Sequence, residues 1–204
     1  LFLLNLIKTM NKYIAECIGT FGLTLAVIVS LGGVISVPTP FIAALTVGLF
    51  VYSIGAISGA HLNPAVTVSL LSLGKINPKD AVAYIVAQFA GALVAMVAGT
   101  FLVVVPVLPV ATTLGVFLAE SLGAFFLMFG IASVVYGKTP APASGIVIGG
   151  SLFLGVSLAS IFSNGVLNPA VALAIGSFSS LYLSGPIIGA VLGGWLFAFV
   201  AGEK

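Results

Sequence analysis

The sequence contains one short motif twice, each time inside a stretch that is otherwise almost entirely apolar. Leu62-Asn63-Pro64-Ala65-Val66 recurs as Leu167-Asn168-Pro169-Ala170-Val171, with the two asparagines 105 positions apart. Asn is a favoured N-cap, and Pro suits the first helical position, where its missing N–H has no partner to lose. Each copy therefore predicts a helix, one starting at Pro64-Ala65 and the other at Pro169-Ala170.

These two helices are too short to cross a membrane. Only about ten apolar or small residues follow each Asn-Pro-Ala, whereas a crossing helix needs roughly 20. Irregular backbone beside such a helix is tolerated at membrane depth only where it is buried in protein or lines a water-filled cavity. Equivalent short helices in two halves are typical of inverted-repeat transport proteins. We expect Asn63 and Asn168 to meet at the midplane and to offer N–H donors to a passing molecule.

The composition indicates a protein embedded in a lipid bilayer. The chain is 61% hydrophobic and 5% charged, against roughly 25% charged residues in ordinary soluble proteins. Six lysines, four acids and no arginine give no indication of nucleic-acid binding. The one cysteine, Cys17, lies in an apolar stretch, which excludes an intrachain disulfide or a cysteine metal site and favours simple packing.

Turn clusters divide the chain into six spans of about 20 residues, the length that a bilayer requires. We expect an all-α polytopic membrane protein, a single domain over 1–204, with six transmembrane helices and two re-entrant half-helices. Its inverted repeats cover about 10–105 and 112–204, separated by a loop with Pro106 and Pro109. The expected segments are Lys12–Leu31, Pro40–Ile57, the half-helix from Pro64 to about Leu73, Ala81–Thr100, Thr113–Tyr136, Ala143–Ile161, the half-helix from Pro169 to about Ser177, and Leu183–Ala201.

The lysines predict the orientation. If the chain crosses the membrane six times, one side receives all of them: Lys8, Lys12, Lys75, Lys79, Lys138 and Lys204. By the positive-inside rule that side, which carries both termini, is cytoplasmic. Leu1 to Ile7 are too few for a span and lack a signal-peptide cleavage site, so we expect Leu1–Thr9 to precede the natural start or to form a short interfacial segment.

Two of the four acids fall inside expected spans. Glu16 and Glu120 are 104 positions apart, nearly the repeat spacing, so they are equivalent. An intramembrane carboxylate is a functional candidate by default, as a proton relay or an ion site. The favoured alternative is that each carboxylate accepts hydrogen bonds from backbone N–H groups of a re-entrant loop. A coupled transporter usually has more titratable groups near its substrate, and here only His61 could act together with the two glutamates.

Two further polar residues lie near the first loop. His61 could act as a pH gate, because its charge changes near physiological pH, but holding the loop by hydrogen bonds is the favoured reading. Gln88 is expected to make an interhelical hydrogen bond. The sequence has no Ser/His/Asp set, no phosphate-binding glycine loop and no metal-ligand spacing, so we expect no enzymatic activity, no cofactor and no metal site.

These features resemble the aquaporins of the major intrinsic protein family. The resemblance covers nearly the whole chain from Met10 onward. It rests on Ser-Gly-x-His-x-Asn-Pro-Ala-Val-Thr at 58–67, Ala-Glu-x-x-Gly-Thr-Phe at 15–21, Gln88 with Gly91-Ala92, Glu120, and Gly-Pro-Ile-Ile-Gly-Ala at 185–190. It implies six tilted helices, half-helices that meet at Asn63 and Asn168, a pore through each subunit and a homotetramer. It also implies that Glu16 and Glu120 brace the re-entrant loops.

The sequence departs from the family at the outer constriction. The second Asn-Pro-Ala is normally followed by Arg, and Val171 stands there instead. As family members align, the other three constriction positions are Ala43, Val156 and Gly165, where water-selective members usually have an aromatic residue and a His at the first two. In another register of that span, Phe41 or Phe50 would intrude. This set implies a wider and more apolar constriction, in which water loses hydrogen bonds and uncharged solutes gain room.

Several functions stay open on these grounds. The first is a passive channel for water and small uncharged solutes. The second is a channel of the same fold that passes mainly glycerol, urea, ammonia or hydrogen peroxide. The alternative from another class is a proton- or ion-coupled small-solute carrier that uses Glu16, Glu120 and His61. A non-conducting packing or junction role is the last.

Overall fold

The computed structural model describes residues 2–104 and 107–203, with the side chains of the first helix described from Met10 onward. Leu1, Pro106 and Lys204, named above, lie outside the described residues. All regular elements in the described part are helical. In chain order they are α1 (Phe2–Leu31), α2 (Thr39–Ser58), α3 (Pro64–Ser72), α4 (Pro78–Gly99), α5 (Leu114–Val135), the 3-10 turn η1 (Ala141–Ala143), α6 (Ser144–Ala159), α7 (Pro169–Ala174) and α8 (Ser180–Val200).

Six helical segments in the described part are long and apolar enough to cross a membrane: α1 from Met10, α2, α4, α5, α6 together with η1, and α8. The short helices α3 and α7 begin after Asn63 and Asn168, as the repeated motif predicts. The expected fold class, six transmembrane helices with two re-entrant half-helices, is thereby confirmed.

Four boundaries differ clearly from those expected. Helix α4 begins at Pro78 rather than Ala81, and α8 begins at Ser180 rather than Leu183, because Asn77 and Ser179 cap them. Helix α1 begins at Phe2 rather than near Lys12. Helix α7 ends at Ala174 rather than near Ser177, because the chain turns out of the helix at Gly176, which has a φ of 75°. The Ser177 N–H then donates to the Ala172 carbonyl at 2.9 Å, the return bond of a helix end closed by a left-handed glycine.

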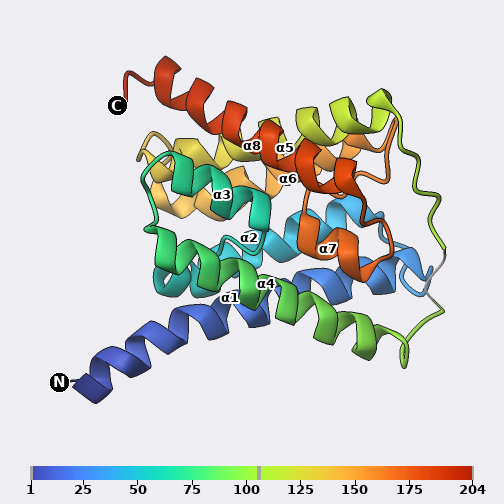
Figure 1. Cartoon of the computed structure of the whole chain (residues 1–204), viewed down its shortest axis with the longest axis horizontal. Helices are drawn as coiled ribbons and strands as arrows, with labels where there is room; N and C mark the ends of the chain where they lie inside the picture. Colours follow the sequence, from blue (N-terminus) through green and yellow to red (C-terminus); the bar gives the residue numbers. More distant parts are fainter. Residues whose placement is uncertain (1, 105–106, 204) are drawn as a thin grey trace.

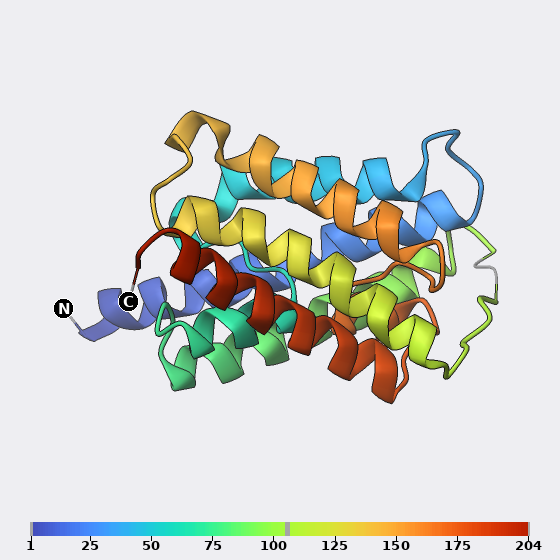
Figure 2. The ribbon, with the colours of Figure 1, turned by 90° about the horizontal axis from the view of Figure 1, so that it is seen from above.

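The long helices lie side by side in an elongated bundle, with both termini at the same end (Figures 1 and 2). We call this end the terminal side. Helix α1 packs along α4, and α5 packs along α8, whereas α2 and α6 join the two halves. Each half-helix packs on the third long helix of the opposite half, α3 on α8 and α7 on α4. The two halves are therefore interlocked rather than simply adjacent.

Glycines let the paired helices approach backbone to backbone. A Cβ atom added at Gly189 of α8 would overlap the Ser121 carbonyl of α5, and one added at Gly91 of α4 would overlap the Cys17 carbonyl of α1. Both positions belong to series of small residues spaced four apart in the sequence, Gly185, Gly189 and Gly193 in α8 and Ala87, Gly91, Ala95 and Gly99 in α4. In a lipid bilayer the hydrophobic effect does not bring helices together, because the lipid tails are themselves apolar. Close packing of this kind stabilises the helix pairs instead.

Substituting Gly189 with Ala should therefore destabilise the α5–α8 pair. The added methyl meets backbone, which cannot move aside as a flexible side chain can, so we expect a loss of about 1–3 kcal/mol. The measurement is the thermal unfolding midpoint of the detergent-solubilised protein. Gly150→Ala is the matched control, because a Cβ there meets no atom within 4 Å. An equal midpoint for both variants would contradict the close approach.

Candidate functional site

The two re-entrant loops, residues 59–63 and 164–168, have unusual backbone geometry. Ala60, Leu62 and Leu167 have positive φ angles of 50°, 51° and 56°, and Gly165 has one of 62°. A left-handed conformation is uncommon outside glycine and costs of order 1 kcal/mol or more, so the surroundings must hold it. The sequence carried a signal for this geometry only at the two glycines, Gly165 and Gly59, which has a φ of 87°.

Glu16 lies beneath the first loop and is fully buried. Its Oε1 accepts hydrogen bonds from the Ser58 hydroxyl at 2.7 Å and the His61 N–H at 2.9 Å. Its Oε2 accepts from the Leu62 N–H at 2.7 Å and the Gln88 amide at 2.8 Å. Four donors therefore converge on one carboxylate, and two of them are N–H groups of the strained loop.

Glu120 has the same relation to the second loop and is also fully buried. Its Oε1 accepts from the Ser163 hydroxyl at 2.7 Å and the Val166 N–H at 3.0 Å, and its Oε2 accepts from the Leu167 N–H at 2.7 Å. These contacts favour loop bracing over a proton relay for both carboxylates. The serines Ser58 and Ser163, one at the start of each motif copy, were not singled out from the sequence, although they are also 105 positions apart.

The two asparagines each complete the loop of the other half. Asn63 caps α3 by accepting from the Ala65 N–H at 2.8 Å, and its Nδ2 donates to the Leu167 carbonyl at 2.9 Å. Asn168 caps α7 by accepting from the Ala170 N–H at 3.0 Å, and its Nδ2 donates to the Leu62 carbonyl at 2.8 Å. Each amide has a second N–H, which this pair of crossed bonds leaves available.

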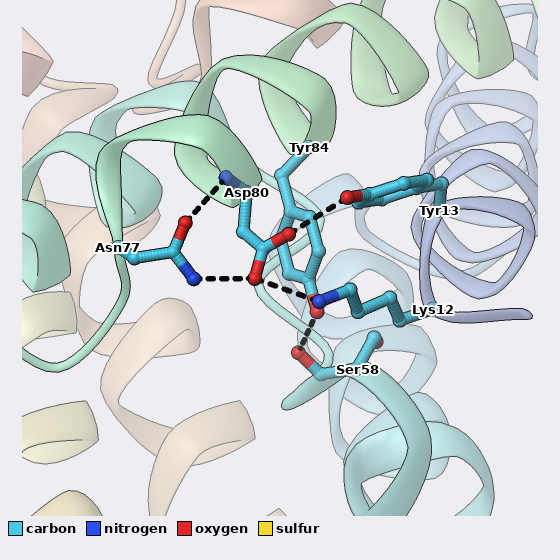
Figure 3. Close-up of polar contacts among 6 residues, drawn as sticks. All are labelled: Lys12, Tyr13, Ser58, Asn77, Asp80 and Tyr84. Atoms are coloured by element: carbon cyan, nitrogen blue, oxygen red, sulfur yellow. Dashed lines mark hydrogen bonds and ion pairs between the residues drawn. The ribbon is translucent and has the colours of Figure 1, made fainter. Parts of the chain in front are cut away.

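A tyrosine on the third long helix of each half fixes the outer end of each loop. The Tyr84 hydroxyl of α4 donates to the Ser58 carbonyl at 2.8 Å (Figure 3). In the other half, the Tyr182 hydroxyl of α8 accepts from the Asn164 N–H at 2.8 Å. The tyrosines are 98 positions apart rather than 105, so the repeat spacing did not identify them.

A polar cluster at the terminal side joins α1 to α4 (Figure 3). Asp80, in the first turn of α4, accepts from the Lys12 ammonium and the Tyr13 hydroxyl of α1, both at 2.7 Å. The Asn77 side chain caps α4 and also donates to Asp80 at 2.6 Å. Because Lys12 and Asp80 form an ion pair, neither charge is left without a partner.

His61 is held on both sides of its ring. Its Nδ1 lies 3.2 Å from the Thr67 hydroxyl, and its ring packs edge-on against Tyr84 with 5.0 Å between centroids. The Gln88 amide, which binds Glu16, also donates to the Thr67 hydroxyl at 3.0 Å. Gln88 thus makes the interhelical contact expected of it, and His61 sits in a hydrogen-bonded loop.

A cavity of about 940 Å³ runs among the helices, and its lining includes residues from both ends of the bundle. Pro40 and Leu108 line it on the side away from the termini, whereas Ala141 and Ser144 line it on the terminal side. Asn63, Asn168 and His61 line it between these ends. Most of the wall is aliphatic, from residues such as Val47, Leu127, Ile131, Ile148 and Leu152.

All four predicted constriction residues line this cavity: Ala43, Val156, Gly165 and Val171. Neither Phe41 nor Phe50 is among the lining residues, and Phe41 is 52% exposed on the outside of α2. The register placing Ala43 on the inner face of α2 therefore holds. The selective role of these four side chains stays a prediction. Within the described residues no group of three or more His, Cys, Asp or Glu could hold a metal ion.

Residues 3–197 match the sequence profile of the family described as major intrinsic protein. Aquaporin NIP1-1 of Arabidopsis thaliana is 32% identical, over 92% of this chain and 73% of its own. Glycerol uptake facilitator protein-like 6 of Lactiplantibacillus plantarum is 34% identical, over 90% of this chain and 94% of its own. The structure of the aquaglyceroporin from Plasmodium falciparum superposes with a TM-score of 0.77, covering 94% of this chain and 95% of that one; at 21% identity it shows the likeness of fold alone.

The convergence of four donors on Glu16 predicts the effect of Glu16→Gln. A glutamine amide places a donor where an acceptor is needed, so at least one buried loop N–H loses its partner, at a cost of about 1–3 kcal/mol. The unfolding midpoint in detergent should fall. The control is Glu203→Gln, which removes the more exposed ion pair of Glu203 with Lys138 and should cost less than about 1 kcal/mol. If Glu16→Gln unfolds at the wild-type temperature, the carboxylate is not the acceptor on which the loop depends.

Proposed function

The chain belongs to the major intrinsic protein family, and on that premise we propose that it is a passive transmembrane channel for water and small uncharged solutes. The observation that carries the proposal is the one cavity that passes both Asn63 and Asn168 and is lined from both ends of the bundle. A cavity of this kind gives a solute a path through the protein itself. The aquaporins and the glycerol uptake facilitator-like protein among its relatives support the same conclusion.

The chemistry of the lining supports uncharged cargo. Aliphatic side chains form most of the wall, and the polar groups between its two ends come from the loop residues around Asn63 and Asn168. A molecule with hydroxyl or amide groups can exchange some of its water for the free N–H of each asparagine while its carbon atoms contact the aliphatic wall. The N-termini of α3 and α7 carry partial positive charge, which disfavours cations near the asparagines.

We further propose that the outer constriction is formed by Ala43, Val156, Gly165 and Val171, and that it admits solutes larger than water. None of these side chains is charged or large. Without an arginine at position 171, a passing molecule meets neither a fixed positive charge nor a bulky donor. Glycerol, urea, ammonia and hydrogen peroxide are the classes of solute that such an opening favours.

The alternative of a coupled carrier using Glu16, Glu120 and His61 gains no support from the contacts. Glu16 and Glu120 are fully buried, are occupied by loop donors and are not among the cavity-lining residues. A proton or ion relay needs its carboxylates to face the path of the cargo. We retain the carrier only as an outcome that the flux experiment below can detect.

The proposal includes the setting of the channel. The belt of exposed apolar side chains, among them Val86, Ile146 and Leu192, suits contact with lipid or with neighbouring subunits. We propose a homotetramer with one pore in each subunit and with both termini in the cytoplasm, as the resemblance and the lysine distribution indicate.

Vesicles containing the purified protein should shrink and re-swell faster than empty vesicles. We expect acceleration under both a sucrose gradient and a glycerol gradient, because the cavity passes the midplane without a charged side chain there. The measurement is light scattering after rapid mixing. Solute flux should rise linearly with concentration and should ignore a pH gradient. Flux that saturates and follows the pH gradient would instead support the carrier.

Replacing Val171 with Arg should restrict the constriction. We expect glycerol permeability to fall roughly tenfold, which requires only about 1.4 kcal/mol of added barrier. Water, being smaller, should be affected less. Val171→Leu is the control that adds bulk without charge, and it should lower glycerol flux less than the arginine does. An unchanged ratio of glycerol to water permeability in Val171→Arg would contradict the assignment of this position.

A further inference from the structure

The cavity lining contains one formally charged side chain among the described residues, and it is Lys75. The two asparagines that line the cavity between its ends, Asn63 and Asn168, are uncharged amides. Lys75 lies in the loop between α3 and α4, at the terminal side of the bundle (Figure 1). Its neighbours in the lining at that end are Val134, Val135, Ala141 and Ser144. We call this end of the cavity the terminal mouth.

The backbone at the end of α3 fixes where Lys75 stands. Gly74 has a φ of 68°, and the chain turns there so that the Lys75 N–H donates to the Leu70 carbonyl at 2.8 Å. This return bond is typical of a helix closed by a left-handed glycine. Leu70 itself is buried and lines the cavity. Lys75 is therefore tied to the wall of the cavity through its own backbone.

The side chain is held as well. The Lys75 ammonium lies over the ring of Tyr136, 4.0 Å from its centroid, at the end of α5. Tyr136 in turn stacks on Phe197 of α8, with 6.3 Å between centroids. Attraction between a cation and an aromatic face favours this position even where both are partly solvated. The charge thus has a defined place beside the terminal mouth.

No carboxylate neutralises this charge within the described residues. Asp80 forms its ion pair with Lys12 at 2.7 Å, and Glu203 forms its own with Lys138 at 2.9 Å. The remaining acids, Glu16 and Glu120, are buried against the re-entrant loops. Lys79 is close in sequence but does not line the cavity. Lys75 is therefore a net positive charge at the opening.

We propose that the Lys75 ammonium repels cations from the terminal mouth and is a residue that determines the channel's selectivity for uncharged solutes. The inference rests on the proposed channel function. A fixed charge a few ångströms from a passing ion lowers the local cation concentration by about three- to tenfold in a solvated opening. It has no comparable effect on glycerol or water, because these carry no net charge. Because Val171 stands in place of the outer arginine, Lys75 is the fixed side-chain charge that a cation meets on its way through the cavity, at the terminal mouth.

The test compares potassium flux with glycerol flux in vesicles of full-length protein. Lys75→Met removes the charge and keeps much of the side-chain length, Lys75→Glu reverses it, and Lys75→Arg keeps it. The matched control is Lys79→Met, which removes a positive charge at the same side away from the cavity lining. Flux is measured at about 0.02 M and about 1 M salt, because the screening length falls to about 3 Å at the higher concentration.

At low salt, potassium flux should rise at least about threefold in Lys75→Met and further in Lys75→Glu, as expected for losing or reversing one nearby charge. Lys75→Arg and Lys79→Met should stay at the wild-type value, and high salt should reduce the differences. Glycerol flux should stay within about twofold in all variants, which also reports that each has folded.

Two results would overturn the inference while leaving the channel intact. One is potassium flux in Lys75→Met and Lys75→Glu equal to that of the wild type, with glycerol flux present. The other is an equal rise in Lys79→Met, which would mean that surface charge in general, rather than this position, is responsible. If the proposed channel function itself is wrong, the result is different: vesicles with the wild-type protein will pass neither water nor glycerol faster than empty vesicles.

Discussion

The structure depends on satisfying backbone N–H groups at a depth where lipid cannot. A re-entrant loop exposes such groups inside the membrane, and each unsatisfied one costs several kcal/mol. Each half of the chain supplies a single buried glutamate that accepts from two consecutive loop N–H groups, Glu16 for His61 and Leu62 and Glu120 for Val166 and Leu167. Because these bonds stabilise left-handed turns, the half-helices can begin at the asparagines and stop short of crossing.

The carboxylates act within one half, whereas the asparagines act between halves. The amides of Asn63 and Asn168 donate to carbonyls of the opposite loop, while α3 packs on α8 and α7 on α4. The outcome is a cavity that passes the amide groups of Asn63 and Asn168, held by these buried bonds, with a mostly aliphatic wall around them. The charge at the terminal mouth is that of Lys75, which is held by the end of α3 and by the ring of Tyr136.

The sequence predicted the parts of this arrangement that are local or repeat at constant spacing. The N-cap asparagines, the six spans and the pair of buried glutamates follow from motif chemistry and from separations of 104 and 105 positions. Tyr84 and Tyr182 were missed because α7, with 6 residues, is shorter than α3, with 9, and because Tyr182 lies nearer the start of its long helix than Tyr84 does. The end of α7 was placed too late, because the turn at Gly176 depends on a return bond to Ala172. Nor could a spacing argument bring Lys75 to Tyr136, since that contact depends on how α3 and α5 are placed in space.

The crossed amide bonds also bear on how the protein is made. A ribosome releases the amino-terminal half first, yet the partner of Asn63 is the carbonyl of a residue 104 positions later in the chain. Until that segment emerges, the first loop has its glutamate but not its second anchor, and α3 lacks α8 to pack against. The crossed amide bonds and the packing of α3 on α8 can therefore form only when both halves of the chain are present.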